Sequence, residues 1–144
     1  PRDPAGLSQR TTGTATAATG SIPADFDTQG FLRQAKLNFI RLQAANDRGD
    51  MDDIRQFASP ELYAEIEMQF RERGGKPQET DVQQLDAEVL EVVTEGSNHV
   101  ASVRFFGTLR EDGATAESFA EVWHLAKPLD GSRGWTIAGI QQVQ

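Results

Sequence analysis

The segment EVWHLAKPLDGSRGWTIAGIQQ, near the end of the chain, holds the side chains most able to do chemistry: Glu121, His124 and both tryptophans, Trp123 and Trp135. A carboxylate and an imidazole beside large rings could transfer a proton. Side chains alternate between the two faces of a strand, however, so His124 and Trp123 are expected to point to opposite faces. The chain also has no cysteine and no histidine pair at metal-ligand spacing. We therefore expect no catalytic residue, no metal site and no cofactor, and we interpret the segment as a β-hairpin.

Glu121 shares its expected face with Trp123, so it could be a buried acid inside a cavity. Tyr63 could then donate a hydrogen bond to an oxyanion, as in a proton-transfer enzyme. The alternative is that Glu121 reaches solvent at a strand edge, or pairs with an arginine such as Arg104. The enzyme or small-ligand hypothesis requires an open pocket between the first helix and the sheet. Its candidate lining residues are Phe31, Phe39, Tyr63, Glu121 and Trp123.

A first helix is predicted to start at Asp27 or Thr28 and to end at Gly49. Large apolar side chains recur along it at spacings of three and four, which is one face of a helix. The residues expected to form this buried stripe are Phe31, Leu32, Ala35, Phe39, Ile40 and Leu42.

Two shorter helices are predicted to follow. Asp50 is the expected N-cap of the second, where the acids Asp52 and Asp53 suit the positive end of the helix dipole better than they suit a metal site. Ser59 and Pro60 form a strong start signal for the third.

Four strands are predicted after the helices, over residues 82–96, 97–112, 116–128 and 134–144, with a bulge near Val89 in the first. Three helices followed by a meander of strands predict an α+β fold. The expected architecture is a cone, with three N-terminal helices packed in the concave face of a curved four-stranded antiparallel sheet. Several strands carry apolar residues on both faces, so we expect the outer face to be covered by a partner or to form a homodimer.

The net charge of -8 argues against nucleic acid as a partner, because phosphate binding requires clustered basic residues.

Residues 1–24 are rich in Thr, Ala, Gly, Ser and Pro, and we expect a flexible tether there, with the domain spanning residues 25–144. A strand added to the sheet edge is the alternative for the tether. The chain begins with Pro1, so we expect a membrane anchor upstream of a domain that is itself soluble.

The first helix is basic although the protein is acidic. Arg33, Lys36, Arg41 and Arg48 lie on its polar side against one acid, Asp47. These cations could be solvated or could pair with the acidic helices that follow. Alternatively, Arg33, Lys36 and Arg41 could dock on an anionic partner or on lipid headgroups.

Two parts of the sequence resemble the Tim-forty-four-like domain family: DTQGFLRQAKLNFIRLQAANDRGDMDDIRQFASPELYAEIE and FAEVWHLAKPLDGSRGWTIAGIQQ. The matching features include Phe31 with Phe39, the Gly-Asp turn at 49–50, SPEL at 59–62, and Glu121 with the tryptophans. The resemblance covers residues 27–143. The family includes the mitochondrial inner-membrane subunit that tethers the import motor, and bacterial membrane proteins of less clear role.

This resemblance implies a fold of the nuclear-transport-factor-two or cystatin-like kind and no known enzymatic activity. It also implies association with the inner membrane and binding of lipids or proteins. We therefore expect a non-catalytic scaffold domain, linked to protein translocation or membrane-protein assembly, with a protein or a membrane lipid as its partner. The amphipathic helices that precede the core in mitochondrial relatives have no counterpart in residues 1–26.

Overall fold

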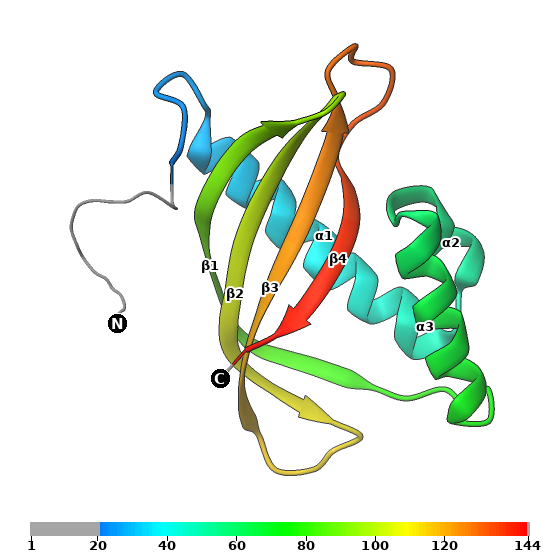
Figure 1. Cartoon of the computed structure of the whole chain (residues 1–144). Coiled ribbons are helices and arrows are strands. Elements are labelled where there is room, and N and C mark those ends of the chain that lie inside the picture. Colours follow the sequence, from blue (N-terminus) through cyan, green and yellow to red (C-terminus); the bar gives the residue numbers. More distant parts are fainter. Residues whose placement is uncertain (1–20, 144) are drawn as a thin grey trace.

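The computed structural model describes residues 21–143, and it confirms the predicted α+β fold (Figure 1). Three helices precede four strands, which pair antiparallel in the order β1-β2-β3-β4. The long helix α1 crosses one face of the curved, open sheet, while α2 and α3 lie beyond the β4 edge (Figure 1). The elements are α1 (Thr28–Arg48), α2 (Met51–Phe57), α3 (Pro60–Glu72), β1 (Thr80–Glu95), β2 (Asn98–Glu111), β3 (Glu117–Pro128) and β4 (Thr136–Gln142).

Each helix begins at the polar residue that the sequence indicates. The side chain of Asp27 accepts a hydrogen bond from the Gly30 backbone N–H at 3.0 Å, and Asp50 and Ser59 cap α2 and α3 in the same way. Gly49 ends α1 with a φ of 73°, a left-handed conformation that favours glycine. A Cβ at this position would also collide with the ring of Phe70 in α3. Gly49 therefore permits both the turn into α2 and the close approach of α3.

The sheet bends where its ladder is irregular. The register of β1 against β2 shifts between Val82 and Gln84 and again between Val89 and Glu91, and the second shift confirms the predicted bulge. Gly107 pairs with Leu85, next to the first irregularity, and a Cβ at this glycine would collide with the backbone carbonyl of Gln84. Bulges increase local twist and bend a strand. These features let the sheet curve around α1.

The core lies between α1 and the concave face of the sheet. Along α1 the buried residues recur at spacings of three and four, as predicted, but Ile40 is 45% exposed, so its placement in the buried stripe was wrong. Ile40 directly follows the buried Phe39, and successive helical residues point about 100° apart. The largest fully buried side chains are Trp123, Phe39, Phe105, Ile54, Leu125, Ile137 and Val103.

Candidate functional site

Aromatic side chains fill the interior of the cone. The ring centroid of Phe39 lies 5.2 Å from that of Trp123, 4.9 Å from Phe105 and 5.5 Å from Phe119. Phe39 and Trp123 are 1% and 0% exposed. These two predicted pocket residues are therefore close together, but they pack against each other instead of lining an open space.

The structure places two other predicted pocket residues elsewhere. Phe31, at the start of α1, packs edge-on against Trp135 with a centroid distance of 5.1 Å. The hydroxyl of Tyr63 in α3 accepts a hydrogen bond of 2.7 Å from Arg55, whose guanidinium lies over the tyrosine ring. Tyr63 is thus held against α2 and makes no hydrogen bond to Glu121.

Glu121 lies at the mouth of the cone, on the same sheet face as Trp123. Its Oε1 accepts a hydrogen bond from Trp123 Nε1 at 2.7 Å, and its Oε2 accepts one from Gln142 Nε2 at 2.9 Å. Arg104, one alternative partner, points to the opposite face and pairs with Glu88 at 3.3 Å. The carboxylate of Glu121 is therefore bound by two neutral donors, whereas an arginine was one of the partners that the sequence allowed.

A cavity of about 340 Å³ opens beside Glu121, between α1, α3 and the ends of β3 and β4. We call it the cone-mouth groove. Its lining is polar at the carboxylates and amides and apolar at the aliphatic residues of both helices and of β4. The lining residues are Leu42, Gln43, Asn46, Leu62, Glu65, Ile66, Gln69, Glu121, Ile140 and Gln142.

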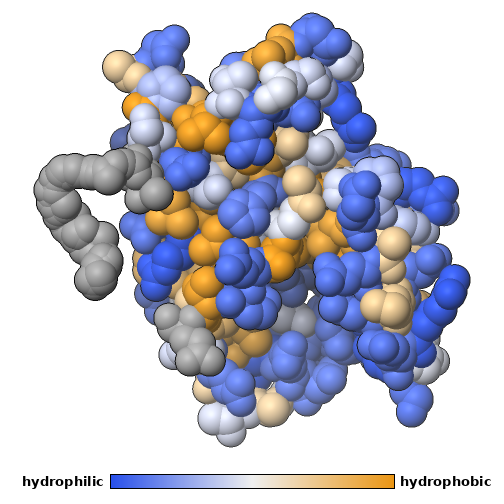
Figure 2. Space-filling model, in the orientation of Figure 1, coloured by the Kyte–Doolittle hydropathy of each residue, from blue (hydrophilic) through white to orange (hydrophobic). Residues whose placement is uncertain are grey.

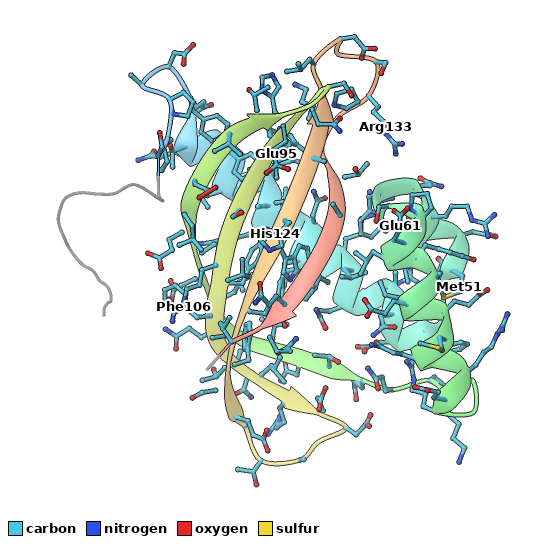
Figure 3. The ribbon with its side chains drawn as sticks, viewed as in Figure 1. Met51, Glu61, Glu95, Phe106, His124 and Arg133 are labelled. Carbon is cyan, nitrogen blue, oxygen red and sulfur yellow. The ribbon has the colours of Figure 1, made fainter. Side chains whose placement is uncertain are left out.

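His124 lies on the outer face of the sheet, turned away from α1 (Figure 3). Its Nδ1 is 3.0 Å from Ser102 Oγ on the neighbouring strand, and the two residues are paired in the ladder. Trp123 is buried on the other face. The arrangement agrees with the predicted alternation of side chains, and it separates the imidazole from Glu121.

The cations in the second half of α1 pair with acids at the start of the next helix, one of the alternatives that the sequence left open. Arg41 Nε donates a hydrogen bond of 3.1 Å to Asp53 Oδ2, and Arg48 pairs with Asp50 at 3.1 Å. The hydrogen bond from Arg41, and then its charge, lower the pKa of Asp53. Arg41 also lies over the Phe57 ring, 4.3 Å from its centroid. Arg41, a candidate for lipid or partner contact, is thus ion-paired within the domain, although its side chain is 42% exposed.

The first half of α1 presents a different surface. Leu37 is 63% exposed and Ile40 is 45% exposed, and both are large apolar residues on the side of α1 away from the core. Arg33 and Lys36 lie four residues before them, so all four side chains are neighbours on the helix surface. None of the ion pairs in the described part of the chain involves Arg33 or Lys36. We call these four residues the α1 outer patch.

The sequence pattern indicated the two cations of this patch but not its two apolar residues. Ile40 was assigned to the core, and Leu37 was not singled out. The signal was present, because Leu37 and Ile40 lie three residues apart on the polar side of the helix. Only their exposure distinguishes such a pair from a widened core stripe.

The outer face of the sheet mixes apolar and polar side chains. Figure 2 shows hydrophobic residues over the strands, interrupted by hydrophilic ones. Phe106 is half-buried under the guanidinium of Arg104, which lies 4.4 Å from the ring centroid. A homodimer through this face stays a prediction.

Within residues 21–143, no group of three or more His, Asp or Glu side chains is arranged to hold a metal ion. None of the described helices is long and apolar enough to cross a bilayer.

Comparison with curated proteins found no match. The sequence model of the Tim44-like domain matches residues 12–142, which is most of the chain and begins within the stretch predicted to be a tether. With its helices followed by a curved antiparallel sheet, this chain belongs to the Tim44-like domain family that the sequence resemblance indicated.

Proposed function

We propose that this chain is a non-catalytic scaffold domain that docks on an anionic membrane surface through the α1 outer patch. Membership of the Tim44-like family supports association with a membrane. The observation that carries the proposal is the exposure of Leu37 and Ile40 beside two cations that no ion pair of the described residues involves. Such a scaffold would hold a partner near the inner membrane, in protein translocation or membrane-protein assembly.

The charge distribution suits this orientation. The chain carries a net charge of -8, so an anionic surface repels the molecule as a whole. Many of the acids lie on the strands and their connections, whereas α1 carries four cations and one acid. Docking through α1 places the cations at the surface and turns the acidic sheet away from it.

The contact is expected to be weak by itself. Each basic residue near an anionic leaflet contributes about 1 kcal/mol, and stable attachment usually needs two separate signals. Two apolar side chains and two cations fit a surface that orients a domain already held near the membrane. We propose that an anchor upstream of the described residues provides that second signal.

Vesicle co-sedimentation of the full chain tests this proposal. Vesicles of phosphatidylcholine with phosphatidylglycerol should retain the protein, and vesicles of phosphatidylcholine alone should not. The double variant Arg33→Gln with Lys36→Gln should bind roughly thirtyfold more weakly, given about 1 kcal/mol for each cation. Replacing Leu37 and Ile40 by Ser should also weaken binding, because it removes the apolar contact.

The matched controls lie outside α1. Met68 in α3 is 54% exposed, so Met68→Ser removes a comparable apolar group from another surface. The exposed cations Lys76 and Arg133 serve as the charge control, with both changed to Gln. If the α1 variants sediment as strongly as the unaltered chain, the lipid contact is excluded and a protein becomes the expected partner of the patch.

A further inference from the structure

We propose that the cone-mouth groove binds an aliphatic cation, namely a primary ammonium group on a methylene stem. The groove is formed by residues of α1, α3, β3 and β4 that come together only in the folded domain. It shares no residue with the α1 outer patch, and the inference does not depend on membrane docking.

The charge of the groove points to a cation. Glu65 and Glu121 contribute two carboxylates, and no lysine or arginine lines the cavity. The two oxygens of Glu121 accept hydrogen bonds only from the uncharged donors Trp123 Nε1 and Gln142 Nε2. Neither carboxylate takes part in the ion pairs found among the described residues. Glu121 is partly buried and Glu65 is exposed, and the negative potential of the two carboxylates in one cavity favours a positively charged ligand.

The remaining lining fits a small ligand with an apolar stem. Leu42, Leu62, Ile66 and Ile140 form the apolar part of the wall, against which methylene groups can pack. An ammonium group has three donors and no acceptor. Glutamine and asparagine side chains that also line the cavity carry carbonyl acceptors beside the two carboxylates. The volume of about 340 Å³ is near the lower end of the range for ligand pockets, which suits one short chain.

Two kinds of molecule carry an ammonium group on such a stem: a free alkyl diamine, and a protein that presents a lysine side chain. An NMR titration of the full chain can test both. Cadaverine represents the free diamine, and N-acetyl-lysine N-methylamide represents the lysine side chain. The neutral control is 1,5-pentanediol, which has the same stem as cadaverine without its charge. We expect saturable shifts of the Gln43 and Gln142 side-chain amides and of the Trp123 indole with at least one amine, and none with the diol.

Two variants test the role of charge. Glu121→Gln keeps the shape and an oxygen that can accept from Trp123, and Glu65→Gln changes an exposed side chain, so both should fold. Each should weaken amine binding about tenfold, since a charge-assisted hydrogen bond becomes a neutral one. Glu61→Gln, exposed on the same helix and outside the groove, should leave the affinity unchanged.

Shifts with only one of the two amines would support the site and identify which kind of ligand it binds. The proposal is overturned if neither amine shifts these signals, if the diol shifts them equally, or if both groove variants bind as the unaltered chain does. The vesicle experiment changes none of the groove residues, so failure of one proposal is distinguishable from failure of the other.

Discussion

The two faces of α1 use similar amino acids for different purposes. The inner face buries Phe39 and Leu42 against the sheet, whereas the outer face leaves Leu37 63% and Ile40 45% exposed. Both pairs are large and apolar, and both lie in the middle of the helix. Hydrophobicity alone therefore does not define the core, because burial depends on what the tertiary structure places opposite each face of the helix.

The largest effect on the free energy of unfolding is expected for the inner face. Phe39→Ala removes a ring that packs against three aromatic neighbours, so it should lower the free energy of unfolding by about 3–5 kcal/mol. Urea denaturation measures this loss. Leu37→Ala is the matched control on the same helix and should change stability by less than about 0.5 kcal/mol. Equal losses for the two variants would contradict the contrast between the faces.

A second prediction concerns the end of the helix, where α1 is tied to β1. Asp47 Oδ2 accepts a hydrogen bond from the Thr80 backbone N–H at 2.6 Å, and Asp47 Oδ1 accepts from Thr80 Oγ1 at 2.8 Å and from Gln78 Nε2 at 3.1 Å. Asp47→Ala leaves these partly buried donors without their partner. It should cost about 1–3 kcal/mol in thermal or urea unfolding. Asp52→Ala, an exposed acid in α2, is the control, and a similar loss there would refute a specific role for Asp47.

A third prediction concerns the border between the faces, where Arg41 holds Asp53. The pKa of Asp53 is lower in the folded protein, so its contribution to stability is present above the unfolded pKa of about 3.9. That contribution is lost as the pH falls through the folded value. Asp53→Asn should therefore reduce stability by less than about 1 kcal/mol at pH 7, because the pair is partly exposed.

The difference between the unaltered chain and the Asp53→Asn variant should shrink as the pH is lowered below about 4. Urea titrations at pH 7 and in acid measure it. A difference that stays constant with pH would show that Asp53 acts through packing and not through its charge.

The smallest effect on stability is expected for the outer face itself. Leu37→Ser and Ile40→Ser should each change the free energy of unfolding by no more than about 0.5 kcal/mol, since both side chains are exposed. A loss of more than about 2 kcal/mol for either variant would mean that the outer face is part of the core. The two substitutions are those of the vesicle experiment, so weaker sedimentation there reports the lost apolar contact and not unfolding.

Much of the fold could be predicted from local patterns. The helix starts at Asp27, Asp50 and Ser59 were visible because a cap is a contact between residues a few positions apart. Strand alternation correctly separated His124 from Trp123. These features depend on neighbours in the chain, so the sequence contains the information needed to place them.

The candidate site could be predicted less well. Glu121 was singled out, but its hydrogen bond to Gln142 depends on the register between β3 and β4. Phe31, Phe39 and Tyr63 were grouped as one pocket, although they lie against Trp135, Trp123 and Arg55 respectively. Residues distant in the chain meet only through packing, which local periodicity does not specify.

By itself, the sequence determined the order of the elements, the helix caps, the β1 bulge and the alternation of side chains in the strands, because each follows from backbone geometry over a few residues. Only the tertiary structure decided that aromatic rings fill the cone, that Arg41 is held by Asp53, and that Leu37 and Ile40 remain exposed. The physical reason is that burial and pairing depend on which surfaces the folded chain brings together.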